Sequence, residues 1–331
     1  MRIAIDAGHS TVKVWADGGR HDVFPARIVA APVTMDLGQL GGDPGAFTIT
    51  EDRDEPVTYW IGERAVPLTP PLWTRDKAAD PLTRGLVYAA CARMGLPDGP
   101  IGIGLGLPLA WFKGGKDSLR AAFVGRTVTV AHGARVNSWK VTAVRVLPQG
   151  ASAALSVFAG GGLSHGGLYV VVDIGYRTTE YVVVEVQGAR LVGRPEWSGM
   201  MNVGWSLVDD TAARRVSDDT GTTIWAASLT GARVMVNGRA LDLAPYRAAG
   251  VAQLANRIAQ TVESSLVGIW DELQVAIIVG GAAPTVAPQL NWGALPIRVP
   301  DQPAMANVQG FWQGVATLPV PLASMRVGGP G

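Results

Sequence analysis

Several residue types are scarce in this chain, and each shortage excludes a class of protein. Cys91 is the only cysteine among 331 residues, so no disulfide can form within the chain. It stands in the apolar-periodic stretch 80–94, which favours a buried core thiol over a nucleophile. No apolar run approaches the roughly 18 residues of a membrane span, and no signal segment opens the chain. We therefore expect a protein of the reducing cytoplasm without a membrane partner.

Charge is also scarce. Charged residues make up 17% of the chain, the net charge is +1, and no basic run stands out. This balance does not favour direct binding of nucleic acid, so any DNA contact is expected to pass through a partner protein. Only five of the 28 basic residues are lysines. Lys13 is notable among them because it directly follows a tight turn.

Hydrophobic residues form 48% of the chain, enough for a sizeable core. Their periodicity predicts alternating strands and helices, which is typical of a layered α/β protein. We expect strands at 2–5, 12–15, 28–31, 47–50, 58–62, 101–107, 128–130, 136–147, 168–172, 181–186, 274–279 and 297–299. We expect helices at 80–94, 151–159, 206–216, 245–270, 284–290 and 303–315, and a hairpin around Asn237-Gly238. The pattern restarts near residue 168, which suggests two similarly built domains with a cleft between them.

Two short segments carry most of the functional information. Each follows an apolar strand, opens with Asp-x-Gly, is rich in hydroxyls and leads into a second strand; they begin at Asp6 and Asp173. A turn of this kind directs several backbone N–H groups toward one point and forms an anion-binding concavity. Gly8 and Gly175 would let the backbone approach a phosphate closely. Two facing turns would hold a polyphosphate between two domains, with the two aspartates near its metal ion.

These segments resemble the actin-like ATPase superfamily, which includes heat-shock chaperones and sugar kinases. Asp6, Gly8 and Lys13 match its first phosphate hairpin, and the segment 173–180 is similar to the second. Gly280-Gly-Ala-Ala-Pro284 resembles the adenosine motif. The segment 148–154 resembles the connecting segment, with Gln149 at the position of the water-orienting glutamine.

Within the superfamily, the chain most resembles the bacterial and archaeal actin-like group around the plasmid-segregation protein ParM. This rests on Tyr59-Trp-Ile-Gly-Glu63 with Ala65, on Gly106-Leu-Pro108, and on Tyr176-Arg177 where two glycines are usual. The resemblance covers residues 1 to about 315. It implies an actin-like α/β fold with domain I at 1–150, domain II at 151–302, a helix at about 303–317 returning to domain I, and a mobile tail at 318–331.

The resemblance also implies roles for individual residues. Gln149 and Asp173 would be catalytic, with Gln149 orienting the attacking water, although it is equally placed to cap a helix. Asp6 and Asp173 would bind hydrated Mg²⁺, the alternative being turn-capping aspartates. Lys13 would contact the β- and γ-phosphates or else be an exposed strand lysine. Residues expected near the nucleotide are Gly8, His9, Ser10, Thr11, Lys13, Gly175, Tyr176, Arg177, Thr178, Asn202, Gly204, Gly280, Gly281 and Ala282.

The implied function is a filament-forming ATPase, or GTPase, whose head-to-tail polymer is disassembled after hydrolysis. Its expected ligands are ATP or GTP with Mg²⁺, and its expected partners are further copies of itself and a DNA-binding adaptor for plasmid segregation. A small-molecule kinase of sugar type and a nucleotide-binding scaffold that does not hydrolyse remain the alternatives. Whether Arg177 contacts phosphate or points away is open.

Overall fold

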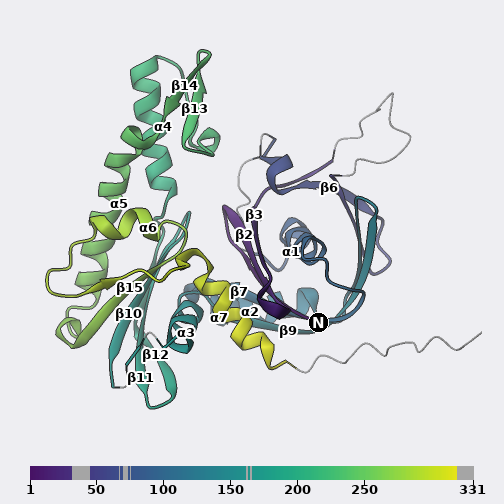
Figure 1. Cartoon of the computed structure of the whole chain (residues 1–331), viewed down its shortest axis with the longest axis horizontal. Coiled ribbons are helices and arrows are strands. Elements are labelled where there is room, and N and C mark those ends of the chain that lie inside the picture. Colours follow the sequence, from purple (N-terminus) through teal and green to yellow (C-terminus); the bar gives the residue numbers. More distant parts are fainter. Residues whose placement is uncertain are drawn as a thin grey trace, which may run out of the picture. The chain divides into compact units, whose positions relative to one another are not determined.

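The computed structural model describes residues 1–31, 45–66, 68–69, 74, 76–161, 163–164 and 166–318. It divides into two compact units. Unit 1 comprises residues 1–107, 113–147 and those from 311 onward, and unit 2 comprises residues 108–112 and 148–310. Each unit has its own sheet and helices (Figure 1), so the predicted layered α/β architecture is confirmed. The domain boundaries at 150 and 302 stay a prediction, and residues 319–331 of the expected tail lie outside the described residues.

Among the described residues, unit 1 contains a nine-stranded sheet in the order β3-β2-β1-β7-β9-β8-β5-β6-β4. Strand β1 pairs antiparallel with β2 and parallel with β7. Each of the strands expected for this part of the chain is present, and β3 is an addition that the sequence analysis does not predict. In the order of the sheet, the bounds are His21–Pro25, Thr11–Ala16, Arg2–Ala7, Gly99–Leu107, Arg135–Pro148, Thr127–His132, Phe47–Glu51, Val57–Ile61 and Ile28–Ala30.

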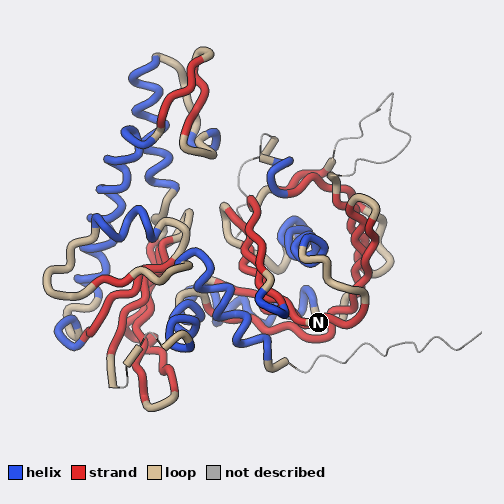
Figure 2. Tube along the Cα trace, in the orientation of Figure 1, coloured by secondary structure: helices blue, strands red, loops and turns tan. Residues whose placement is uncertain are grey.

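The strands of unit 1 curl around helix α1, which spans Pro81–Arg93 (Figures 1 and 2). The helix begins where the Asp80 carboxylate accepts hydrogen bonds from the backbone N–H groups of Leu82 and Thr83. All residues from Leu86 to Cys91 are buried. The predicted helix is thus confirmed, but it is buried on all sides rather than along one stripe, because the curled sheet surrounds it.

Glycines in β7 admit helix α7, which spans Ala306–Ala316. A Cβ atom on Gly106 would lie 2.0 Å from Cζ of Phe311, and one on Gly104 would lie 3.3 Å from the carbonyl oxygen of Phe311. The strand therefore lies close against α7, with an aromatic side chain next to Gly106 and a backbone oxygen next to Gly104.

Unit 2 is built on a five-stranded sheet in the order β12-β11-β10-β15-β16. Strands β10 and β15 are parallel, and β10, β11 and β12 pair antiparallel in turn. The sequence analysis does not predict β12. In the order of the sheet, the bounds are Arg190–Met201, Thr179–Gln187, Leu168–Ile174, Leu273–Val279 and Ile297–Arg298.

Both faces of this sheet are covered. Val170 and Val172 of β10 belong to the core that includes α5 (Ala244–Ser265), and Tyr169 and Val171 belong to the core beneath α3 (Ala151–Ala159). This explains why β10 is a continuous apolar run, since a strand covered on both faces has no polar side.

A smaller core joins α4 (Ser206–Thr220) to the hairpin of β13 (Arg233–Val236) and β14 (Arg239–Asp242). The hairpin turns at Asn237 and Gly238, which both have positive φ, as predicted.

Several helices differ from expectation. Helix α4 extends to Thr220, and α7 begins at Ala306 after a 3₁₀ turn. Helix α2 (Leu109–Phe123) is not predicted, since Gly114 and Gly115 lower its helix propensity. Helix α5 ends at Ser265, before residue 270, and in the turn that follows a Cβ atom on Gly268 would lie 2.9 Å from the Trp197 ring. Helix α6 (Ala283–Val286) passes into a 3₁₀ turn because Pro288 lacks the N–H that an α-helix needs.

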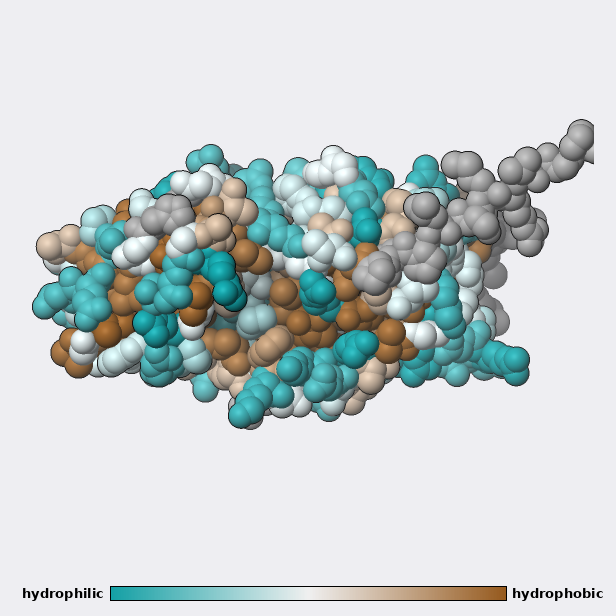
Figure 3. Space-filling model, turned by 90° about the horizontal axis from the view of Figure 1, so that it is seen from below, coloured by the Kyte–Doolittle hydropathy of each residue, from teal (hydrophilic) through white to brown (hydrophobic). Residues whose placement is uncertain are grey.

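The face of the molecule in Figure 3 carries hydrophilic residues with hydrophobic ones between them. Over the residues that the structure describes, no helix is both long enough and apolar enough to cross a membrane.

Candidate functional site: two matched phosphate-type hairpins

The first Asp-Gly segment forms the tight connection between β1 and β2. The Gly8 N–H donates to the carbonyl oxygen of Thr11 at 3.1 Å, which closes the turn. A Cβ atom on Gly8 would lie 2.8 Å from that same oxygen, so the turn has no room for a side chain there. The chain folds this way because the glycine permits the close approach of its own backbone.

The second segment connects β10 to β11 in the same way. The Gly175 N–H donates to the carbonyl oxygen of Thr178 at 2.9 Å, and a Cβ atom on Gly175 would lie 3.0 Å from it. Register also matches: Asp6 stands opposite Lys13, and Asp173 stands opposite Glu180. Each hairpin therefore places an aspartate two residues before the turn glycine, at the end of a buried strand.

Charged groups gather around the first hairpin. Asp6 is 3% exposed, and its Oδ2 atom lies 3.3 Å from Nζ of Lys13. Lys77, which is also buried, donates from Nζ to the carbonyl oxygen of Ala7 at 2.8 Å. Sequence reasoning missed Lys77, although its rarity as one of five lysines was an available signal. Two ammonium groups and one carboxylate thus meet at the base of this turn.

In unit 2 the structure brings Asp173 close to the segment that carries Gln149. Asn307 donates from Nδ2 to Oδ2 of Asp173 at 2.6 Å, and its Oδ1 accepts the N–H of Gly150 at 2.9 Å. Gln149 itself is half-buried, directly before this glycine. Asn307 is the second residue that sequence reasoning missed, and no motif surrounds it.

The glycines after β15 lie beside the same carboxylate. Strands β10 and β15 are parallel neighbours and pair Asp173 with Val279, so their carboxyl ends meet at one sheet edge. Ligands of α/β proteins commonly bind at such an edge. Gly280 has φ +93°, and a Cβ atom there would lie 2.4 Å from Oδ1 of Asp173. Gly281 is exposed with open space around it, and Ala282 is buried.

The segment 202–206 clamps the second hairpin from the start of α4. The Trp205 and Ser206 N–H groups donate to the carbonyl oxygens of Gly175 and Tyr176 at 3.0 and 2.7 Å. A Cβ atom on Gly204 would lie 2.5 Å from the Gly175 oxygen. Gly204 is therefore required for packing on the hairpin. Asn202 is exposed beside it, and a contact of either residue with nucleotide stays a prediction.

Side chains at the turns face different ways. The Thr179 hydroxyl is fully buried and donates to the carbonyl oxygen of Val203 at 2.8 Å, so it is not available to a ligand. At the tips, Arg177 is exposed and the remaining residues are half-buried; these are His9, Ser10, Thr11, Tyr176 and Thr178.

Glu180, the counterpart of Lys13, is part of the scaffold. Its side chain is 2% exposed and accepts the N–H of Leu109 at the start of α2 at 3.2 Å. A carboxylate at a helix N-terminus is favourably placed.

The carboxylates suit magnesium better than a metal held by protein alone. Within the described ranges, no three His, Cys, Asp or Glu side chains gather as a metal-binding cluster. Each hairpin supplies one aspartate, and Mg²⁺ is usually held by one or two carboxylates together with waters and substrate phosphates. Each aspartate by itself is of the kind that holds hydrated Mg²⁺, and binding of the ion by Asp6 and Asp173 stays a prediction.

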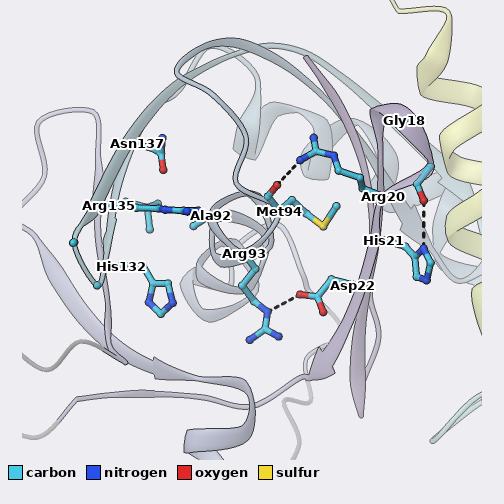
Figure 4. Close-up of a pocket in the computed structure, with 14 residues that line it drawn as sticks. Gly18, Arg20, His21, Asp22, Ala92, Arg93, Met94, His132, Arg135 and Asn137 are labelled. Atoms are coloured by element: carbon cyan, nitrogen blue, oxygen red, sulfur yellow. Dashed lines mark hydrogen bonds and ion pairs between the residues drawn. The ribbon is translucent and has the colours of Figure 1, made fainter.

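A hollow of about 970 Å³ lies at the end of α1 in unit 1 (Figure 4). No predicted site residue lines it. Two of its three arginines are engaged: Arg93 pairs with Asp22 at 2.7 Å, and Arg20 donates to the carbonyl oxygen of Met94 at 2.8 Å. We therefore do not assign it to the phosphate chemistry of the hairpins.

Two family models match the chain. Residues 4–151 match the N-terminal domain of actin-like proteins, and residues 171–291 match the C-terminal part of the archaeal MreB-like actin homologue. Archaeal actin homologues of Thermoplasma volcanium and Thermoplasma acidophilum are 25% and 23% identical to it. Each alignment covers 93% of this chain and 97% of the relative.

Solved structures give the same fold. A crystal structure of an archaeal actin homologue superimposes with a TM-score of 0.81 at 22% identity, over 95% of this chain and 99% of that one. The same protein in complex with ADP gives 0.78 at 21% identity, over 95% and 99%. A ParM subunit from a 15-stranded filament of Clostridium botulinum gives 0.81 at 19% identity, over 96% and 99%. The actin-like fold predicted from the motifs is confirmed.

Proposed function

Because the chain belongs to the actin-like protein family, we propose that it is a nucleotide-dependent, filament-forming ATPase. The observation that carries the proposal is the matched pair of hairpins. Both close with the same glycine-to-threonine hydrogen bond, and both place an aspartate at the same register position. A turn of this geometry is suited to binding phosphate, and the chain carries it twice.

The proposed roles follow the positions of the side chains. The turns at Gly8 and Gly175 bind phosphate oxygens through backbone N–H groups, and Lys13 adds a positive charge beside the first turn. Asp6 and Asp173 hold hydrated Mg²⁺, whose charge offsets the negative charge on the phosphates.

Gln149 orients the attacking water; this needs no strong general base, because phosphoryl transfer relies on positioning and charge stabilisation. Gly280, Gly281 and Ala282 form the surface beneath the adenosine. The open space at Gly281 and the ADP complex of the archaeal relative support this assignment.

We further propose that the chain polymerises head to tail and that hydrolysis releases the polymer. A heterologous contact that does not close into a ring produces such a filament. The 15-stranded ParM filament of Clostridium botulinum supports this assembly. The proposed setting is the cytoplasm, where a DNA-binding adaptor would connect the filament to a plasmid.

Polymerisation tests the proposal directly. The purified chain is mixed with ATP or GTP, with Mg²⁺ or with EDTA, and followed by light scattering, phosphate release and electron microscopy. We expect filaments with one or both nucleotides in Mg²⁺ and none in EDTA. Absence of filaments and of phosphate release with both nucleotides would overturn the proposal, and turnover that requires an added sugar would favour the kinase alternative.

A variant separates assembly from hydrolysis. Gln149→Ala should slow phosphate release by roughly 100-fold, as loss of a positioned catalytic group commonly does, and should prolong the filaments. Gln187→Ala, at the exposed end of β11, is the matched control. Unchanged turnover in Gln149→Ala would remove this residue from the mechanism.

A further inference from the structure

One buried amide connects two of the segments identified above, and its neighbour Pro303 holds a third. Asn307 is 5% exposed and stands at the start of α7. Its Nδ2 donates to Asp173 at 2.6 Å, and its Oδ1 accepts from the Gly150 N–H at 2.9 Å. Four residues earlier, the Pro303 carbonyl oxygen accepts the N–H of Gly280 at 2.8 Å. The corner 303–307 thus holds the second hairpin, the Gln149 segment and the glycine motif after β15.

The two partners determine how the amide is oriented. A backbone N–H can only donate, and an ionised carboxylate can only accept, so Oδ1 must face Gly150 and Nδ2 must face Asp173. No other uncharged side chain of this length offers one donor and one acceptor in this arrangement. A hydrogen bond to a carboxylate is also stronger than one between neutral groups.

Gly150 needs this support because its conformation is unusual. It has φ +68° and ψ −60°, and a Cβ atom there would lie 2.6 Å from Cγ2 of Val182. It is the N-cap residue of α3 and has no side chain with which to hold the turn. The Asn307 oxygen satisfies its N–H group. Since Gln149 directly precedes this glycine, the same bond restricts where the glutamine backbone lies.

Asp173 is held on its other side as well. Its Oδ1 atom lies against Gly280, where a Cβ atom would approach to 2.4 Å. The carboxylate is therefore located between a glycine that cannot be enlarged and an amide that donates to it. Its direction is set before any ligand arrives.

We propose that Asn307 is a positioning residue that sets the Asp173 carboxylate and the Gln149-bearing turn in one fixed relation. The inference rests on the proposed nucleotide hydrolysis, in which these two residues act. It adds a residue from a third segment, the start of α7. Displacement of that segment would disturb metal binding by Asp173 and the orientation of water by Gln149 at the same time.

Two substitutions separate the two bonds. Asn307→Leu removes both, whereas Asn307→Asp keeps an acceptor for Gly150 but places a second carboxylate against Asp173. In the nucleotide-free chain, exchange of the Gly150 amide should accelerate roughly tenfold or more in Asn307→Leu and little in Asn307→Asp, since only the first loses the acceptor. Asn291→Asp, in an exposed loop, is the matched control.

The Mg²⁺ dependence gives the second readout. In Asn307→Asp, the paired carboxylates should weaken the Mg²⁺ dependence of nucleotide binding and lower kcat roughly tenfold. A merely structural role would lower the melting temperature and leave the Mg²⁺ dependence of the folded protein unchanged.

The outcomes are distinguishable. If the parent chain neither binds nor hydrolyses nucleotide, the proposed function fails and this inference fails with it. If the parent chain is active and both variants match it in Mg²⁺ dependence, kcat and Gly150 exchange, only the role of Asn307 is refuted. Loss of activity in Asn307→Asp that follows the unfolded fraction would also refute it.

Discussion

Substitution of Gly310 by alanine tests how tightly α7 is fitted to the Gln149 segment. A Cβ atom on Gly310 would lie 1.8 Å from the carbonyl oxygen of Ser152 and 2.4 Å from its carbonyl carbon. Ser152 is buried in the first turn of α3, and its hydroxyl donates to the Pro148 carbonyl oxygen at 2.8 Å. The neighbouring atoms are backbone, so no side-chain rotation can relieve the clash.

The expected loss of stability follows from how far α7 and α3 must move apart. Real Cβ atoms do not approach within 3.0 Å of such neighbours, so α7 and α3 must separate by more than 1 Å. Overpacking usually costs about 1–3 kcal/mol, and a backbone shift belongs at or above the upper end. For a unit of this size we expect a decrease of roughly 6–12 °C in Tm, at about 2–4 °C per kcal/mol. Phosphate release should fall as well, because Gln149 moves with α3.

Gly114 provides the control, since it is also helical but has no atom within 4 Å of its built Cβ. Gly114→Ala should stabilise the chain by up to about 1 kcal/mol through helix propensity alone. Calorimetry and urea denaturation of the two variants measure both effects. A melting temperature for Gly310→Ala within about 2 °C of the parent value would refute the packing argument, because that shift corresponds to no more than about 1 kcal/mol.

Three further predictions follow from buried or hydrogen-bonded groups. Thr179→Val should destabilise the chain by about 1–3 kcal/mol in urea denaturation, because the Val203 carbonyl loses its donor. Thr211→Val should have little effect, since its hydroxyl bonds a helix carbonyl that keeps its backbone partner. Burial raises the pKa of the Cys91 thiol to about 12, so Ellman's reagent should react only after unfolding; rapid labelling of the native chain would contradict this. A backbone N–H that donates to Asp52 lowers the pKa of that carboxyl. Its stabilisation is present above the ordinary value of 3.8 and is lost as the pH falls through the lower native value, so Asp52→Asn should flatten the acid limb of a stability profile.

Many of the helices and strands could be predicted from the sequence because the buried residues recur at regular spacing. The apolar runs of β1 and β10 and the period of α5 predict their elements directly. The residues at which helices end are harder to predict from the sequence. Helix α5 stops at Ser265, and Gly268 in the following turn packs against Trp197, a residue 71 positions earlier; no local pattern encodes that contact.

Some positions in the candidate site could likewise be predicted from the sequence, and others could not. Gly8, Gly175, Asp6 and Asp173 could be identified from spacing, because a tight turn needs its glycine and aspartate at set intervals. The Thr179 hydroxyl follows the second turn directly but is turned inward, onto the Val203 carbonyl oxygen. Spacing within a turn does not reveal which of its side chains another element covers.

The sequence by itself determined that two similar strand-turn-strand units recur in one α/β chain, and where their glycines and carboxylates stand. Such features are local, since they depend on φ, hydrogen bonding and alternation over a few residues. Only the tertiary structure decided that the two hairpins close with the same bond and register, that Lys77 reaches the first turn, and that Asn307 joins Asp173 to Gly150 across 134 and 157 positions. Contacts at such separation arise from the packing of whole helices on sheets, which no short motif records.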